Sequence, residues 1–384
     1  MDKRLLLISS NSSERGGGER YLVYLTQGLR FIGCEVHILL STVKYMDDWA
    51  KVLSAEGAQV HRRNLLGLRS RPLRFLQSIT DKNQQLKIAK ACEEIDPDAI
   101  LVNQQYDEDG LDYLAGALRA DIAPVGGLIH MPMTATKDQR PFGKIRGKLL
   151  KKWYFQHPYN LIVVSKGSKA EFINYYNVPY PISIVHHGYP FGEGTRIESE
   201  VLKFQGNSLP TIGFLGQFVS QKNLLLLVEG WLWLCKQGIE TRLLLVGDGP
   251  ERTSIEKLLS STAPKETWHI TGWQNQPEKY LSVIDLYAMT SHFEGLPLAL
   301  LEAVGSGLPA VVTNFNGASD VAEYAPWVKI VENPNPISVG QALASSIQNL
   351  STLKQQAQEG KEIFRHYFSL QRMAQDTLVT LGIA

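Results

Sequence analysis

The sequence predicts an α/β protein of two domains, each built around a parallel sheet. Three observations support this prediction. Short apolar runs alternate with segments of helical periodicity in the first half, the same alternation starts again after residue 205, and a turn-rich stretch, 188–210, separates the two series. Such alternation is typical of βαβ units, whose strands run parallel. A chain of 384 residues, 44% hydrophobic, can bury two cores.

The first half starts with a βαβ unit in which strands at 4–9 and 35–40 flank a helix at 19–32. Apolar runs bounded by turn residues predict further strands at 99–103, 125–130, 161–165 and 182–186. Helical periodicity predicts helices at 84–95 and 168–176.

In the second half the same patterns predict strands at 211–215, 241–246, 268–271, 286–288 and 310–313. Helices are predicted at 224–237, 251–259, 277–284 and 297–305. We therefore expect an N-terminal domain over 1–188, a C-terminal domain over 189–365, and a final helix, 366–384, packing back toward the N-terminal domain. Ligands of parallel sheets bind beyond the carboxyl ends of the strands, so we expect the two domains to face each other across a cleft.

Composition predicts a cytoplasmic protein without disulfides. The cysteines Cys34, Cys92 and Cys235 are far apart and form no C-x-x-C pair, so neither a disulfide framework nor a zinc site is indicated. The N-terminus lacks the pattern of a signal peptide, and no apolar run reaches the length of a membrane span. We expect a protein that is neither exported nor membrane-spanning, and no nucleic-acid partner.

The net charge of +1 is unevenly distributed, because residues 1–188 contain 25 Lys and Arg against 19 Asp and Glu. One acid-free basic segment lies at 62–74. The other, 140–154, interleaves its bases with apolar side chains such as Ile145, Leu149, Leu150 and Trp153, the pattern of a helix that lies on an anionic membrane. An ordinary surface helix with its apolar stripe in the core is an equally good interpretation.

The most informative motif is Glu294-Gly-Leu-Pro-Leu-Ala-Leu-Leu-Glu302. Pro297 suits the first helical position, which puts Glu294 in the preceding loop and Glu302 inside the helix. Free amides of the first turn then lie between two carboxylates, and a helix start binds anions. A nucleoside-diphosphate sugar fits this layout, with hydroxyls at both ends and a diphosphate between them. A capped helix with Glu302 on its solvated face is the alternative.

Two glycine-rich loops follow predicted strands. Gly16, Gly17 and Gly18 open a helix, where backbone amides can approach a phosphate or a sugar. Neither this loop nor Gly247-Asp-Gly-Pro matches the dinucleotide fingerprint G-x-G-x-x-G, so we expect no nicotinamide cofactor.

Lys222 and His130 are the further candidates for chemistry. Lys222 lies in the loop after the strand at 211–215, where it can neutralise a diphosphate leaving group. His130 ends a strand and can bond a sugar hydroxyl or assist proton movement, although a structural histidine is the alternative. His186 and His187 show no metal spacing and are interpreted as part of the joint between domains.

Taken together, these motifs resemble the retaining glycosyltransferases of family 4 (glycosyl transferases group 1), which have the GT-B fold of two Rossmann-like domains facing across a cleft. The resemblance spans nearly the whole chain and is most specific in the second half. It is carried by the glycine loop 16–20, His130, the strand that ends at Ser165, His187-Gly188, 216–222, 245–250, Gly272, 291–303 and 307–309.

The resemblance implies a role for each matched residue. Lys222 would hold the donor diphosphate, Glu302 the ribose, and Glu294 the transferred sugar, near which His130 would also lie. The other donor-binding positions that it implies are Gly16, Gly17, Gly18, Gly216, Gln217, Gly295, Leu296 and Leu298. Gln217 stands where the family commonly has Arg, so Lys222 is the one cation expected there.

The implied reaction transfers a hexose from a nucleoside-diphosphate sugar to a hydroxyl acceptor in polysaccharide, lipid-linked glycan or glycolipid synthesis. The acceptor attacks the same face that the diphosphate leaves, with no protein nucleophile, cofactor or metal. A nucleotide-sugar epimerase and a non-catalytic sugar-nucleotide-binding module stay open as alternatives. The donor base, the sugar and the acceptor are also open, and an anionic membrane surface is a further expected partner.

Overall fold

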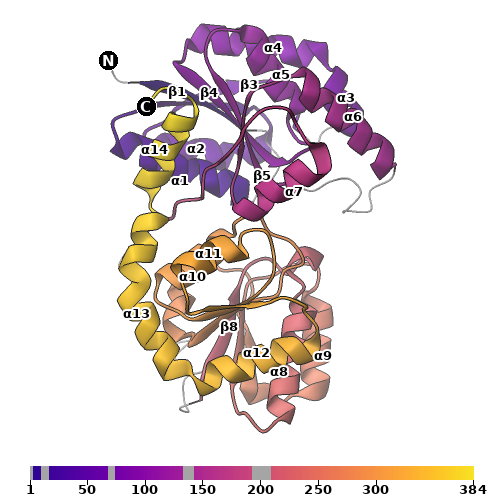
Figure 1. The fold of residues 1–384 in the computed structure, drawn as a ribbon, viewed down its shortest axis with the longest axis vertical. Helices are drawn as coiled ribbons and strands as arrows, with labels where there is room; N and C mark the ends of the chain where they lie inside the picture. The colour runs from indigo at the N-terminus through magenta and orange to yellow at the C-terminus, as the bar shows by residue number, and fades with distance from the viewer. Residues whose placement is uncertain (1–2, 10–16, 68–73, 133–141, 193–208) are drawn as a thin grey trace. The chain divides into compact units, whose positions relative to one another are not determined.

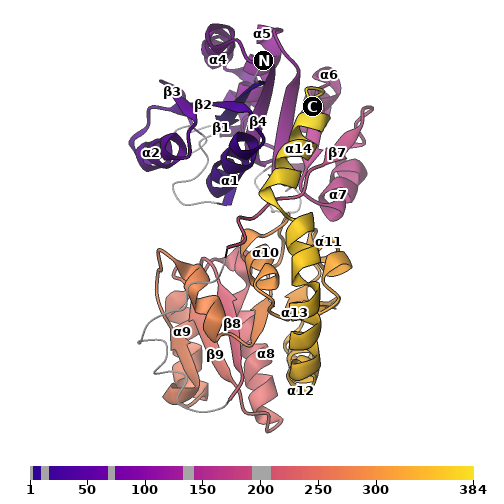
Figure 2. The ribbon, with the colours of Figure 1, turned by 90° about the vertical axis from the view of Figure 1, so that its left-hand side faces the viewer.

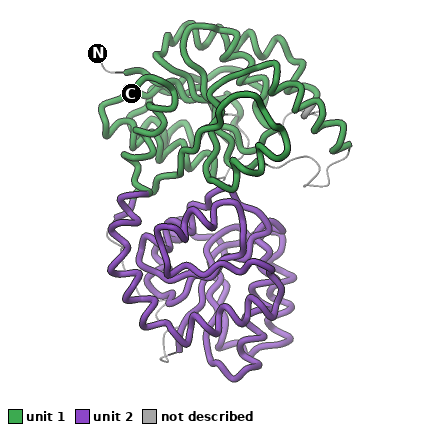
Figure 3. Tube along the Cα trace, viewed as in Figure 1, with its two compact units in different colours: residues 1–190, 368–384 green, residues 191–367 purple. Residues whose placement is uncertain are grey.

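The computed structural model describes residues 3–9, 17–67, 74–132, 142–192 and 209–384. The chain forms two compact units (Figure 3). Unit 1 consists of Met1–Pro190 together with Phe368–Ala384, and unit 2 of Phe191–Tyr367. Each unit is a Rossmann-like α/β fold around one parallel sheet, as the sequence predicts. Among the described residues, no helix combines the length and the apolar character that crossing a membrane requires.

The sheet of unit 1 has seven strands in the order β3-β2-β1-β4-β5-β6-β7, and all neighbouring pairs are parallel. The order reverses at β1, so β1 and β4 flank the point where such sheets bind ligands. The strands are β1 (Arg4–Ser9), β2 (Glu35–Ser41), β3 (Gln59–Arg63), β4 (Ala99–Tyr106), β5 (Val125–Met131), β6 (Asn160–Val163) and β7 (Ile182–Ile184).

Helices cover both faces of this sheet (Figure 1). One face packs against α4, α5, α6 and α7, whose buried side chains share a hydrophobic core with alternate residues of the strands, such as Leu6 and Ile8 of β1. The other face packs against α1. The helices of this part are α1 (Gly17–Phe31), η1 (Lys44–Met46), α2 (Asp47–Ala55), α3 (Arg74–Thr80), α4 (Lys82–Ile95), α5 (Leu111–Ala120), α6 (Gly143–Gln156) and α7 (Lys166–Tyr176).

The last helix of the chain, α14 (Leu370–Thr380), belongs to unit 1 and lies beside α1 in both ribbon views (Figure 2). Its approach is close. A Cβ atom on Gly28 of α1 would be 2.4 Å from the carbonyl oxygen of Leu370. The Tyr189 amide donates to the carbonyl of Phe368 at 2.9 Å, so the segment that leaves unit 1 and the segment that re-enters it are hydrogen bonded to each other.

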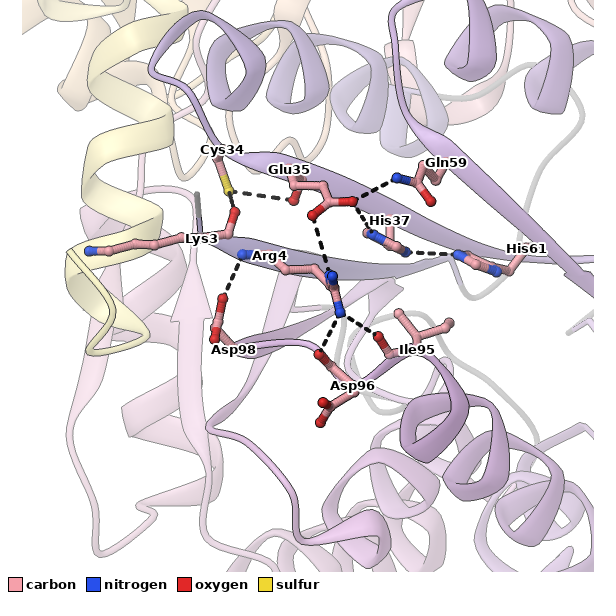
Figure 4. A network of polar contacts seen from close by, with 10 residues as sticks. All are labelled: Lys3, Arg4, Cys34, Glu35, His37, Gln59, His61, Ile95, Asp96 and Asp98. Carbon is pink, nitrogen blue, oxygen red and sulfur yellow. Dashed lines mark hydrogen bonds and ion pairs between the residues drawn. The ribbon is translucent and has the colours of Figure 1, made fainter. Parts of the chain in front are cut away.

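A polar network ties together the amino ends of β1, β2 and β4 (Figure 4). Arg4 and His37 both contact Glu35, at 3.3 and 3.1 Å, and His37 reaches His61 of β3 at 2.9 Å. The Arg4 amide donates to Asp98, just before β4, at 2.7 Å. The hydrogen bond from His37 is the main cause that lowers the Glu35 pKa. Ligands of parallel sheets bind at the carboxyl ends of the strands. The pair His37–His61 lies at the amino ends, so we assign it to the stability of the sheet and not to a ligand site.

The sheet of unit 2 has six parallel strands in the order β10-β9-β8-β11-β12-β13. The order reverses at β8, so the loops after β8 and β11 lie at its switch point. The strands are β8 (Thr211–Leu215), β9 (Arg242–Val246), β10 (Trp268–Ile270), β11 (Leu286–Met289), β12 (Ala310–Thr313) and β13 (Val328–Val331). The helices are η4 (Ser220–Lys222), α8 (Leu224–Lys236), α9 (Arg252–Thr262), η5 (Lys265–Thr267), η6 (Pro277–Val283), α10 (Leu298–Gly305), α11 (Ala318–Tyr324), α12 (Pro336–Gln348) and α13 (Leu350–Tyr367).

All the strands expected from the sequence are present, and β1, β8 and β12 have the expected bounds. Two strands were not expected. Both β3 and β13 lie at the edge of their sheets, where a strand needs fewer buried side chains and shows no continuous apolar run. The helix expected at 277–284 forms as the 3-10 helix η6.

Candidate functional site

The loops after β8 and β11 are hydrogen bonded to each other at the carboxyl edge of the unit 2 sheet. The His292 amide donates to the carbonyl of Gln221 at 2.9 Å, and the Gln221 side chain donates to the carbonyl of Phe293 at 3.0 Å. The Thr290 hydroxyl donates to the carbonyl of Asn223 at 2.9 Å. These bonds fix the residues between them, so the positions of Lys222 and Glu294 are set by the backbone.

Lys222 and Glu294 form an ion pair, with 2.6 Å between Nζ and Oε1. The two residues are 72 positions apart in the sequence, and their side chains are only 17% and 7% exposed. A cation and a carboxylate that are both largely withdrawn from water need each other as partners. The structure thus brings together two residues that the sequence singled out independently.

The turn after Glu294 differs by one residue from the sequence prediction. Pro297 has an extended conformation and its carbonyl accepts from the amides of Leu300 and Leu301, so it caps α10, which begins at Leu298. The expected position of Pro297 inside the first turn was therefore wrong. A helix supplies no carbonyls for its own first amides, which leaves those of Leu298 and Ala299 pointing beyond the helix start.

Glu302 lies inside α10 as expected, and it is buried. Burial excludes the alternative in which Glu302 lies on a solvated helix face. Glu302 and Glu294 both act on Tyr287 of β11, whose pKa is held well above its ordinary value, first by burial and then by the negative charge of Glu302, with a smaller contribution from Glu294. The negative charges of both acids of the motif are therefore close enough to act on the same buried hydroxyl.

Glycines allow the site loops to pack backbone against backbone. A Cβ atom on Gly247, after β9, would be 1.9 Å from the carbonyl oxygen of Gly216, after β8. A Cβ atom on Gly317 would be 2.3 Å from the carbonyl oxygen of Gly295 in the turn before α10. Gly216 and Gly247 also have positive φ, of 153° and 142°. These contacts explain why glycine is needed at positions that do not fit a dinucleotide fingerprint.

The other predicted donor-binding residues of unit 2 lie in the same loops. Gly295 and Leu296 are buried in the turn, Leu298 is half-buried, and Gln217 is exposed just after Gly216. Thr290 and Gln221, which fix the loops, were not predicted, because their role depends on pairing between β8 and β11 that the sequence does not reveal.

In unit 1, His130 belongs to a chain of hydrogen bonds at the carboxyl ends of β4 and β5. Asn103 donates through Nδ2 to the carbonyl of Gly18 at 3.2 Å, so its Oδ1 is free to accept from His130 Nε2 at 2.7 Å. His130 Nδ1 lies 2.9 Å from Nε2 of His187. In a neutral His130, Nε2–H donates to Asn103 and Nδ1 accepts from His187, so both ring nitrogens are hydrogen bonded.

Burial also favours the neutral form of His130. Loss of solvent is the main cause that lowers its pKa well below the ordinary value, and nearby His187 adds to this effect. The ring packs edge-on against buried Tyr21, with centroids 4.9 Å apart. His187 was interpreted from the sequence as part of the joint between the domains. Its hydrogen bond to His130 was not predicted, because 57 residues separate the two histidines.

The glycine loop is only partly described. Gly16 lies outside the described residues. Gly17 is exposed at the start of α1, and a Cβ atom there would have no neighbour within 4 Å. Gly18 is buried, and a Cβ atom there would be 2.8 Å from Oε1 of Gln105 and 3.6 Å from the His130 ring. The helix start and His130 are thus neighbours in unit 1.

Two family models match the chain. The model described as Glycosyltransferase Family 4 matches residues 15–191, and the one described as Glycosyl transferases group 1 matches residues 199–363. Together they cover both units, including the unit 1 histidine chain and the unit 2 acid pair.

Curated relatives are similar over part of the chain. A lipopolysaccharide core biosynthesis glycosyltransferase of Rhizobium meliloti is 27% identical over 155 residues, which are 40% of this chain and 44% of the relative. A UDP-Gal:alpha-D-GlcNAc-diphosphoundecaprenol alpha-1,3-galactosyltransferase of Escherichia coli is 27% identical over 148 residues, 36% of this chain and 38% of the relative. The chain thus spans less than half the length of these relatives.

Solved structures match over the whole chain. A glycosyltransferase from Rickettsia africae has a TM-score of 0.76 at 16% identity, covering 100% of this chain and 98% of the other. The Anabaena protein Alr3699/HepE, solved in complex with UDP and glucose, has a TM-score of 0.75 at 16% identity, covering 100% of both chains. Fold, motifs and family models agree, and the chain belongs to family 4 of the glycosyltransferases, with the GT-B fold.

Proposed function

We propose that this protein moves a hexose from a nucleoside-diphosphate sugar to a hydroxyl acceptor, with retention at the anomeric carbon and without a metal ion. The acceptor belongs to polysaccharide, lipid-linked glycan or glycolipid synthesis. The observation that carries the proposal is the Lys222–Glu294 ion pair in the loop before α10. It sets a cation, a carboxylate and a helix start at one edge of the unit 2 sheet, where parallel sheets bind nucleotides.

Lys222 is suited to hold the diphosphate. An ammonium group has three N–H donors, so it can keep its bond to Glu294 while it donates to a phosphate oxygen. Glu294 then orients the ammonium before the donor arrives, which spares the enzyme that ordering cost during the reaction. The amides of Leu298 and Ala299 supply further donors with the positive end of the helix dipole behind them.

The two acids are suited to bind hydroxyls on either side of the diphosphate. A carboxylate accepts two hydrogen bonds from neighbouring hydroxyls, as a ribose or a hexose presents them. We assign Glu302 to the ribose and Glu294 to the transferred hexose. Similar proteins support this class of donor, because Alr3699/HepE was solved with UDP-glucose and the Escherichia coli relative is named for UDP-Gal.

In the proposed transfer step, the bond between the anomeric carbon and the diphosphate oxygen breaks, and its electron pair stays on that oxygen. The acceptor oxygen bonds to the same face of the anomeric carbon, and the acceptor's proton passes to the leaving phosphate. Lys222 and the first amides of α10 stabilise the negative charge that develops on the diphosphate. No side chain has to form a bond to the sugar.

His130 is proposed to bind a sugar hydroxyl in its neutral form. Its Nε2–H donates to Asn103, so a sugar hydroxyl must replace Asn103 as the acceptor or bind beside it. A histidine whose pKa lies well below the ordinary value is a poor general acid at neutral pH. His130 therefore contributes a hydrogen bond rather than a proton.

A thermal-shift panel of UDP-, GDP- and ADP-sugars tests the donor class, because a ligand that binds the folded state raises the melting temperature. The stabilising donor is then incubated with and without hydroxyl acceptors, with and without EDTA, and the anomeric configuration of the product is read by NMR. Transfer with retention in EDTA is expected. Isomerisation of the donor alone would favour an epimerase, and binding without turnover would favour a binding module.

We also propose that the enzyme works as a peripheral protein at a membrane, where lipid-linked acceptors are found.

A further inference from the structure

Helix α6 has one face fixed in the core of unit 1. Leu150, Trp153 and Tyr154 are buried in the hydrophobic core shared with α4, α5 and α7. The sequence left open whether the apolar residues of this segment face the core or the surface. The structure divides them, because these three face inward while Ile145 and Leu149 face outward.

Polar contacts on the inner side fix the rotation of α6 about its axis. The Tyr154 hydroxyl donates to the carbonyl of Asp107 at 2.5 Å, and Arg146 pairs with Glu108, whose side chain is only 4% exposed. Gly147 lets α7 approach, since a Cβ atom there would collide with the Tyr175 hydroxyl. The side of α6 that faces solvent is therefore determined by the fold.

The outer face of α6 combines four lysines with exposed apolar side chains. Ile145 and Leu149, one helical turn apart, are 59% and 41% exposed, Phe155 is 44% exposed, and Phe142, just before the helix, is 77% exposed. No acid occurs in Gly143–Gln156. The four exposed lysines are Lys144, Lys148, Lys151 and Lys152. We call this set the α6 outer face.

Helix α4 of the same unit shows what an ordinary solvated face looks like. It also exposes lysines and one leucine, Leu86, at 47%. Its C-terminal turn, however, carries two exposed acids, and Glu94 pairs with Arg63 at 2.7 Å and with Lys90 at 3.9 Å. A single exposed leucine among mixed charges needs no explanation. The α6 outer face differs in having several apolar groups and charges of one sign.

We propose that the α6 outer face docks the protein on a membrane that contains anionic lipid. The lysines meet the negative headgroups, and Ile145, Leu149 and Phe155 enter the boundary between headgroups and acyl chains. Charge complementarity selects this partner, because the face has no acid to pair with a basic surface. The inference extends the proposed work at a membrane, yet the docking itself requires no transfer of sugar.

Sedimentation of the full-length protein with vesicles tests the docking. We expect binding to vesicles of phosphatidylcholine with 30–40% phosphatidylglycerol, weaker binding in 1 M salt, where charges are screened within about 3 Å, and little binding to phosphatidylcholine alone. Lys148→Gln with Lys152→Gln should weaken the partition coefficient by about 30-fold, from the usual contribution of each basic residue. Ile145→Gln with Leu149→Gln should weaken it by at least about 10-fold.

Matched controls come from α4 of the same unit. Lys82→Gln with Lys87→Gln removes the same charge from exposed positions, and Leu86→Gln removes a leucine of similar exposure. These variants should bind vesicles like the wild type. The proposal would be overturned if the α4 and α6 variants lost vesicle binding equally, or if binding did not depend on anionic lipid. So would a dimer in light scattering that Leu149→Gln dissociates, since a second copy would then cover the face.

Donor-induced thermal shifts of the α6 variants separate this proposal from the proposed function. None of the residues proposed to bind the donor lies on α6 (Gly143–Gln156), so these variants should keep the wild-type shift. If the protein binds vesicles but no sugar nucleotide raises its melting temperature, the docking proposal stands and the proposed donor class is wrong.

Discussion

Replacing Lys222 with methionine is the sharpest test of the donor site. Methionine keeps most of the apolar stem but leaves the Glu294 carboxylate, 7% exposed, without its cation. Breaking a fully buried pair costs about 3–5 kcal/mol, and the 17% exposure of Lys222 lets water compensate in part, so we expect a loss of about 2 kcal/mol. For a unit of this size that lowers the melting temperature by about 4–8 °C. Loss of one charge contact to the leaving group should lower kcat/KM about 100-fold.

A double variant separates stability from catalysis. With Lys222→Met and Glu294→Gln together, no unpaired charge remains, so most of the lost stability should return. Activity should stay at least as low as in the single variant, because the diphosphate has still lost its cation. Differential scanning fluorimetry and steady-state kinetics measure the two effects. Wild-type kcat/KM in a stably folded Lys222→Met protein would refute the role of the lysine.

Two further predictions concern the stability of the two units. Gly247→Ala should lower the free energy of unfolding of unit 2 by at least about 2 kcal/mol, because its Cβ atom would lie 1.9 Å from the carbonyl oxygen of Gly216. The control is Gly238→Ala, which also has positive φ but no neighbour within 4 Å, so it adds backbone strain without a collision. Equal melting temperatures of the two variants would contradict the packing argument. The His130 pKa is lower in the folded state than in the unfolded chain, so unfolding takes up a proton below about pH 6.5, and stability is lost as pH falls through that range. In urea titrations from pH 8 to pH 5, His130→Asn should reduce this slope by up to about 1.4 kcal/mol per pH unit, and an unchanged slope would show that His130 titrates normally.

The order of strand, turn and helix around the candidate site of unit 2 could be predicted from the sequence because each element depends on local chemistry. Strand 286–288, the Gly-Leu-Pro turn and the apolar helix follow one another within twenty residues, so their order along the sheet edge follows from periodicity and turn residues alone. The error of one residue at Pro297 has a local cause as well. Proline fits both the cap and the first helical position, and only the hydrogen bonds of Leu300 and Leu301 decide between them.

Contacts between distant segments could not be predicted. The bond between His130 and His187 and the ion pair of Lys222 with Glu294 join residues 57 and 72 positions apart. Each depends on the strand order, which periodicity does not give. The edge strand β3 was missed for a related reason, since its sequence, Gln-Val-His-Arg-Arg, is stabilised by pairing with β2 rather than by burial.

The return of α14 to unit 1 has a consequence for biosynthesis. A ribosome delivers the seven strands of that sheet first, but the helix that packs beside α1 emerges only after all of unit 2. Until then Gly126 of β5, which Leu381 contacts in the finished fold, stays uncovered. Unit 1 is therefore completed only after unit 2 has been synthesised, and until then it exposes apolar surface that invites chaperones.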